Sequence, residues 1–176
     1  MNPRRRSALL FSAVAGAALG AGFFAGPAIF RRDPVDAGLL LRMRFADLQG
    51  RPRTLSEWQG VILVVNFWAT WCAPCLEEIP MLMATRKAYA SLGVEVVGIG
   101  IDLASKIADF SSKLRIDYPI LVAEADALDL LRKLGNSAAG LPYTLFFDRN
   151  TIPVERRLGA LKRLDVEAIL RELVKK

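Results

Sequence analysis

Two long apolar runs mark the centre of the chain. Residues 61–67 are apolar apart from Asn66, and residues 94–101 contain a single charged side chain, Glu95. A strand whose two faces are both covered loses the alternation of apolar and polar positions. We therefore expect both runs to be central strands, with residues 119–122 as a third, shorter one.

Helical patterning follows these runs. The final segment repeats apolar residues on one face of a 3.6-residue period, at Val166, Ile169, Leu170, Leu173 and Val174. Further helices are expected at residues 73–92, 105–114 and 126–134. Pro80 should kink the first of these, because proline cannot donate the helical hydrogen bond.

The second half of the chain also predicts a hairpin. Residues 143–148 and 152–158 read as strands around a turn at residues 149–151, although this turn lacks the glycine that tight turns favour. The alternation of strands and helices predicts an α/β protein, in which a mixed central sheet carries helices on both faces.

The N-terminus has a different pattern. Residues 7–30 contain no charged side chain and follow Arg4, Arg5 and Arg6. A helix of this length runs about 36 Å, enough for a hydrocarbon core of about 30 Å. The arginines favour an N-terminus held inside. We therefore expect residues 1–32 to form a transmembrane anchor, with a signal peptide cleaved near Ala17 as the alternative.

The remaining chain reads as one domain behind a short linker. Residues 33–39 carry charge, Pro34 and Gly38, which predicts a tether, and residues 40–176 suffice for a single domain. The net charge is +6, and five arginines flank the anchor. Attraction to anionic lipid headgroups explains this charge, so we expect contact with the cytoplasmic membrane and no nucleic-acid binding.

Both cysteines, Cys72 and Cys75, lie where the first apolar run passes into the first helix. Residues three apart at a helix start share a face and come within disulfide distance. The first sulfur then lies over free backbone N–H groups and the positive end of the helix dipole, which favours its thiolate. We expect Cys72 to be a redox nucleophile and Cys75 its resolving thiol, rather than a purely structural disulfide.

Four motifs carry a family resemblance. They are VNFWATWCAPC at residues 65–75, EIP at residues 78–80, GLPYT at residues 140–144, and the lead-in FADLQG at residues 45–50. Together they resemble the TlpA/ResA-like branch of the thioredoxin superfamily, whose members are membrane-anchored, extracytoplasmic thiol:disulfide oxidoreductases. The resemblance implies a thioredoxin-like fold.

The resemblance also implies a proton acceptor. Thioredoxin-like proteins often carry a buried Asp at the position of Asn66, and Asn cannot titrate. In the TlpA/ResA-like branch, a Glu three residues after the second Cys takes over this role, and Glu78 occupies that place. Since positions i and i+3 share a helix face, the Glu78 carboxylate is expected to accept the proton of Cys75. Its neighbour Glu77 is expected to be solvated.

A second implied feature is a substrate-binding surface. Pro142 matches the cis-proline loop of the superfamily, which implies a cis Leu141–Pro142 bond facing the cysteines. The backbone of Leu141 would then pair with an extended substrate chain. The candidate substrate-binding residues are Trp71, Pro74, Leu141 and Pro142.

The implied function is reduction of disulfides in extracytoplasmic proteins, in cytochrome c maturation or copper-site assembly, with a DsbD- or CcdA-type membrane electron donor. The domain would then lie in the periplasm or outside the cell, either anchored or released after cleavage. The absence of His and of further Cys excludes a closed zinc site, and we expect no cofactor.

Two alternatives stay open. A Cu(I) chaperone fits two thiolates, because soft sulfur suits this ion. A peroxidase is the other, because the lead-in region resembles that of peroxiredoxins, although Thr70 stands two residues before Cys72 where their signature has Thr three before.

Overall fold

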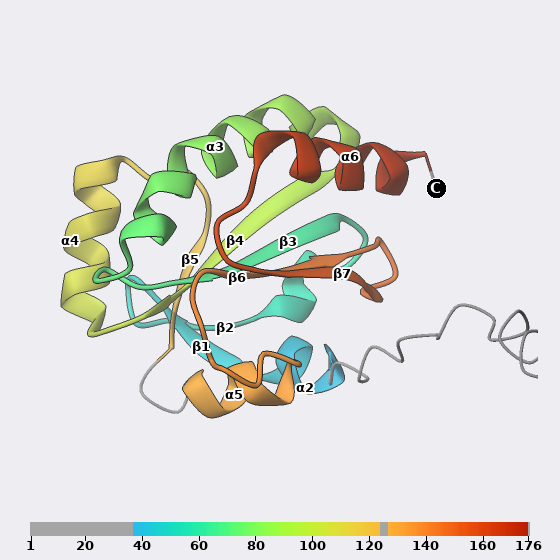
Figure 1. Ribbon diagram of the computed structural model, residues 1–176. Coiled ribbons are helices and arrows are strands. Elements are labelled where there is room, and N and C mark those ends of the chain that lie inside the picture. Colours follow the sequence, from blue (N-terminus) through green and yellow to red (C-terminus); the bar gives the residue numbers. More distant parts are fainter. Residues whose placement is uncertain (1–36, 124–126, 176) are drawn as a thin grey trace, which may run out of the picture. The chain divides into compact units, whose positions relative to one another are not determined.

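The computed structural model describes residues 37–123 and 127–175, which belong to one compact unit of the chain (Figure 1). The segment expected to be an anchor or signal, residues 1–32, lies outside the described residues. Within the described ranges, no helix combines the length and the hydropathy needed to cross a membrane. Helix α2 begins at Ala37, inside the range 33–39 that was expected to be a tether.

A seven-stranded mixed sheet forms the centre of the described residues, in the order β2-β1-β5-β4-β3-β6-β7. Strands β3, β4 and β5 are parallel, and the others are antiparallel to their neighbours. The strands are β1 (Arg44–Asp47), β2 (Pro52–Thr54), β3 (Ile62–Trp68), β4 (Val94–Ile101), β5 (Ile120–Ala123), β6 (Tyr143–Phe147) and β7 (Pro153–Leu158).

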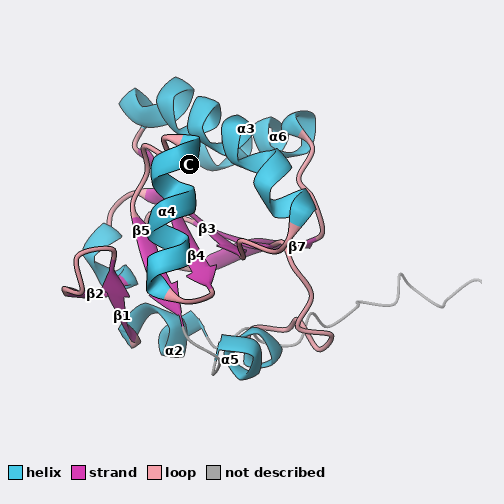
Figure 2. Cartoon of the chain, turned by 90° about the vertical axis from the view of Figure 1, so that its left-hand side faces the viewer, coloured by secondary structure: helices cyan, strands magenta, loops and turns pink. Residues whose placement is uncertain are grey.

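Helices cover both faces of this sheet, as Figures 1 and 2 show. On β3, Val65 and Phe67 belong to one apolar core, whereas Val64 and Trp68 belong to the other, so every residue of the strand is buried. The first core includes residues of α2 (Ala37–Arg42) and α5 (Ala127–Lys133). The second includes residues of α3 (Ala73–Tyr89), α4 (Ala104–Leu114) and α6 (Arg163–Val174). The mixed sheet with helices on both faces is confirmed.

The local differences from the expected elements have physical reasons. Helix α3 ends at Tyr89 and passes into a 3-10 turn, Ala90–Leu92, and it continues through the exposed Pro80. The hairpin turn forms without glycine because Thr151 adopts a left-handed φ of 63°. The carboxylate of Asp148 supports it by accepting two backbone N–H bonds, each 2.9 Å long.

The strand directions bring three loops together at one end of the central strands, the carboxyl end of β3. Strands β3 and β4 are parallel, so the loops that follow them leave at the same end. Strand β6 runs antiparallel to β3 and pairs Tyr143 with Phe67, so the loop before β6 lies at that end too. The residues after β3, after β4 and before β6 therefore surround one site.

Candidate active site at the carboxyl end of β3

Cys72 is the N-cap of α3, and Ala73 and Pro74 are the first helical residues. A disulfide joins Cys72 to Cys75, with an S–S distance of 1.99 Å and a Cα–Cα distance of 5.3 Å. Cys72 is 6% exposed, whereas Cys75 is fully buried. Of the two cysteines, Cys72 is therefore the one that an outside thiol or disulfide can approach.

Glu78 lies one turn beyond Cys75 on α3 and is only 4% exposed. Its two carboxylate oxygens have separate donors. The Asn66 side-chain amide donates to Oε1 over 2.7 Å, and the backbone N–H of Leu161 donates to Oε2 over 2.8 Å. The structure therefore places Glu78 inside the site, while its neighbour Glu77 is exposed as expected.

Burial raises the pKa of Glu78 above its ordinary value, while the bonds from Leu161 and Asn66 act in the opposite direction. A carboxylate with a raised pKa holds a proton more readily than one in water. This property suits a group that must take a proton from a thiol and later release it.

Asn66 is the residue that holds Glu78 in place. Its Nδ2 donates both to Glu78 and to the Thr144 hydroxyl, the latter over 2.9 Å, and Thr144 is its pairing partner on β6. Its Oδ1 is buried and has no hydrogen-bond partner among the described residues. Asn66 cannot titrate, but it orients the group that does, a role that its residue type alone did not reveal.

The loop before Cys72 is fixed by a contact that sequence reasoning missed. The Thr70 hydroxyl donates to Asp102, which directly follows β4. Asp102 also accepts the N–H of Leu103 and lies 3.5 Å from the Lys106 ammonium. The hydroxyl of Thr70 is the main factor that lowers the pKa of Asp102. Thr70 and Asp102 are 32 residues apart, and no local sequence pattern connects them, so the sequence alone did not predict this link.

The candidate substrate-binding residues surround the cysteine pair unequally. The Leu141–Pro142 bond is cis, as the resemblance implied. Pro142 is buried, Leu141 is partly buried, Pro74 is exposed, and Trp71 is 66% exposed. Trp71 and Pro74 are therefore accessible from solvent beside the cysteines, whereas the Pro142 side chain is enclosed within its loop.

The model of the AhpC/TSA family matches residues 40–157, about two thirds of the chain. The chain belongs to the AhpC/TSA family. It is 26% identical over 129 residues to the thiol-disulfide oxidoreductase ResA of Geobacillus thermodenitrificans, covering 73% of this chain and 72% of that relative. The same name is carried by the Geobacillus kaustophilus relative, which is 27% identical over 128 residues, covering 72% of this chain and 71% of that relative.

Solved structures agree with this family. A thiol:disulfide interchange protein of the thioredoxin family from Chlorobium tepidum matches with a TM-score of 0.63 and 25% identity, over 75% of this chain and 92% of that one. This AhpC/TSA-family protein has the thioredoxin-like fold and is a thiol-disulfide oxidoreductase. The TlpA/ResA-like resemblance is thereby confirmed.

Proposed function

We propose that this enzyme reduces disulfide bonds in proteins outside the cytoplasm, with Cys72 and Cys75 as its dithiol. The observation that carries this proposal is the Cys72–Cys75 disulfide at the start of α3, with Glu78 buried one turn further along the same helix. This arrangement supports thiol–disulfide exchange, because the helix start favours a Cys72 thiolate and Glu78 lies on the same helix as a proton acceptor.

The reaction proceeds in two exchange steps. The Cys72 thiolate attacks one sulfur of the client disulfide, forms a mixed disulfide and releases the other client sulfur as a thiolate. Cys75 then attacks the Cys72 sulfur, closes the enzyme disulfide and releases the second client thiolate. Two electrons pass from the enzyme dithiol to the client.

Each step uses a different part of the helix start. Backbone N–H groups and the helix dipole stabilise the Cys72 thiolate, because Cys72 caps α3. Cys75 is fully buried, where a thiol is reluctant to ionise, so its proton needs an acceptor. Glu78 takes this proton from the next turn of α3, while Asn66 and Leu161 hold its carboxylate in place.

The cellular setting forms part of the proposal. Residues 1–32 anchor the chain in the cytoplasmic membrane, or direct its export before cleavage, so that the domain works in the periplasm or outside the cell. There a DsbD- or CcdA-type membrane protein returns electrons to the dithiol. The clients are disulfide-containing proteins of cytochrome c maturation or of copper-site assembly.

The reduction potential of the Cys72/Cys75 pair tests the proposed direction. Equilibration against glutathione buffers should place it near that of thioredoxin, about −270 mV, and a value near that of the oxidant DsbA, about −120 mV, would contradict reduction as the function. Copper retention through gel filtration and peroxide consumption by the reduced protein test the two alternatives. We expect neither copper retention nor peroxide consumption. If the protein shows one of these activities and does not reduce insulin, the reductase proposal is wrong.

A further inference from the structure

The loop before Pro142 is held by a buried side chain whose role the proposed mechanism does not include. Asn136 is 2% exposed and directly follows the turn that ends α5. Its Nδ2 donates to the Gly140 carbonyl over 2.8 Å, and its Oδ1 accepts the Gly140 N–H over 3.2 Å. One side-chain amide therefore satisfies both backbone polar groups of Gly140, as a neighbouring strand would do.

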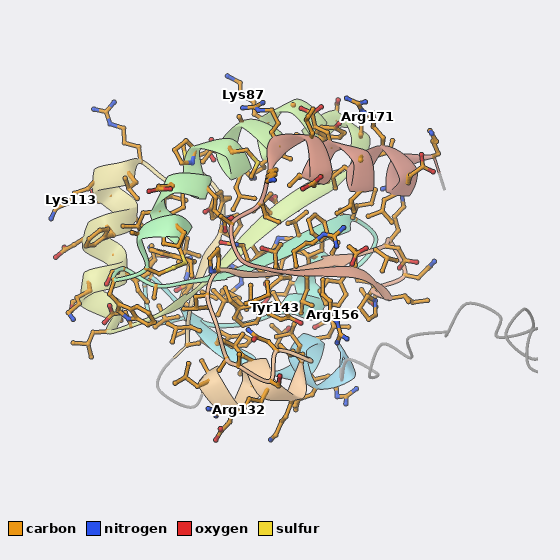
Figure 3. The ribbon with its side chains drawn as sticks, viewed as in Figure 1. Lys87, Lys113, Arg132, Tyr143, Arg156 and Arg171 are labelled. Carbon is orange, nitrogen blue, oxygen red and sulfur yellow. A yellow bond between two sulfur atoms is a disulfide. The ribbon has the colours of Figure 1, made fainter. Side chains whose placement is uncertain are left out.

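Asn136 is itself firmly anchored. Its backbone N–H donates to the Leu131 carbonyl of α5 over 2.9 Å, and its carbonyl accepts the Ala139 N–H over 2.9 Å. The Tyr143 hydroxyl donates to the Leu134 carbonyl over 2.6 Å. Figure 3 shows Tyr143 beside Arg156, with which its side chain also hydrogen-bonds. The base of the loop is therefore tied to the sheet.

The far side of the loop is fixed as well. The Pro142 carbonyl accepts the backbone N–H of Gly159 over 2.8 Å, and proline has no N–H of its own. Between these two fixed points, the backbone N–H and C=O of Leu141 make no hydrogen bond to any other described residue. Leu141 is therefore the one residue of segment 140–142 whose backbone is available to another chain.

This arrangement is maintained against local strain. Ala139 adopts a left-handed φ of 49°, which costs free energy for a residue other than glycine. Such a conformation persists only where surrounding contacts impose it. The paired side-chain bonds between Asn136 and Gly140 close the loop over Ala139, and together with the bond from the Ala139 N–H to the Asn136 carbonyl they hold this conformation.

We propose that Asn136 is a positioning residue for client binding: its amide fixes Gly140 so that the Leu141 backbone pairs with an extended client segment beside the client disulfide. This inference rests on the proposed disulfide reductase function. Its partner is an extended polypeptide, because pairing to one N–H and one C=O is strand addition and needs no particular side chain.

The test compares two disulfide substrates. Insulin presents its disulfides within polypeptide chains, whereas cystamine is a small disulfide with no peptide backbone. Asn136→Ala removes both bonds to Gly140, so we expect kcat/KM for insulin to fall about tenfold, mainly through KM. The rate with cystamine should stay within about twofold of wild type, because the cysteine pair is untouched.

Two further variants keep the test decisive. Asn136→Asp keeps the side-chain volume and the acceptor for the Gly140 N–H, but it places an oxygen against the Gly140 carbonyl, so it should show the same selective loss without leaving a cavity. Asn150→Ala removes an exposed Asn from the turn at the opposite end of β6 and should match wild type with both substrates.

The outcomes separate this inference from the function on which it rests. Equal losses with both substrates in the Asn136 variants, or no loss with either, would overturn the positioning role while leaving the reductase function intact. A wild-type enzyme that reduces neither substrate would instead overturn the proposed function, and this inference with it.

Discussion

Glu78 offers a sharp test, because its two hydrogen bonds allow different replacements to be ranked. In Glu78→Leu, two donors lose their acceptor: the Leu161 N–H and the Asn66 N–H that is not bonded to Thr144. Two stranded donors cost about 2–6 kcal/mol of the free energy of unfolding. Glu78→Leu should therefore be destabilised by about this amount.

Glu78→Gln should be tolerated better. The glutamine carbonyl can accept the Leu161 N–H, but its NH₂ group then faces the Asn66 Nδ2, which is also a donor. A flip of the Asn66 amide would not remove this conflict, because its NH₂ would then lie where Oδ1 has no hydrogen-bond partner among the described residues. Glu78→Gln keeps one of the two acceptors and should cost about 1–3 kcal/mol, less than Glu78→Leu, and equal destabilisation by Leu and Gln would refute this hydrogen-bond scheme.

The stability of wild type relative to Glu78→Gln should depend on pH. Burial raises the pKa of Glu78, so the folded protein holds this proton more tightly than the unfolded chain does, where the ordinary value is 4.5. The stability that this proton contributes is complete below pH 4.5 and is lost as the pH rises through the raised pKa. Urea unfolding of the oxidised proteins should therefore show wild type losing stability relative to Glu78→Gln as the pH rises.

The chemical consequence is measured on the second exchange step. Without a carboxylate beside Cys75, resolution of the mixed disulfide should slow on the order of a hundredfold near neutral pH, the lower end of what a general base contributes. Stopped-flow release of the client thiol measures this rate. The control is Glu77→Gln on the exposed side of α3, and equal slowing in both variants would show that Glu78 acts only through general electrostatics.

Three further predictions follow from single contacts. Iodoacetamide should modify Cys72 of the reduced protein before Cys75, as peptide mapping would show, because Cys72 is the only one of the two cysteines with any exposed surface. Trp71→Ala should leave stability within about 0.5 kcal/mol of wild type and slow client reduction, because this indole is mostly exposed; unchanged reduction would remove it from the binding surface. Gly98→Ala should cost about 1–3 kcal/mol in urea unfolding, because the added Cβ would lie 3.0 Å from the Tyr118 ring.

The sequence predicted those parts of the fold that depend on continuous burial. The runs at residues 61–67 and 94–101 became β3 and β4 to within one residue, because a strand covered on both faces must be apolar throughout. Strand β1 was not predicted as a strand. Its four residues, Arg44–Asp47, alternate exposed and buried positions over too short a length to give a clear period.

Apart from the Pro142 loop, which the family resemblance implied, the candidate site was predictable only from neighbours in the sequence. The cysteine spacing placed Cys72 at the helix start, and helical periodicity placed Glu78 one turn beyond Cys75. The second donor to Glu78 is the backbone N–H of Leu161, 83 residues away. Every residue except proline has such an N–H, so the residue type at this position could not indicate the contact. The hydrogen bonds from Asn136 to Gly140 were not predicted for a related reason: Asn and Gly are both common in surface turns, so their proximity in the sequence is not informative.

Cys72 attacks the client and Cys75 resolves the mixed disulfide, and trapping of that mixed disulfide tests these two roles most directly. Reduced Cys75→Ser protein is mixed with insulin, quenched with acid, and the cross-linked peptides are mapped by mass spectrometry. We expect a stable mixed disulfide through Cys72 in this variant and none in Cys72→Ser, because Cys75 is fully buried. A mixed disulfide through Cys75 in Cys72→Ser, or none in either variant, would contradict these roles.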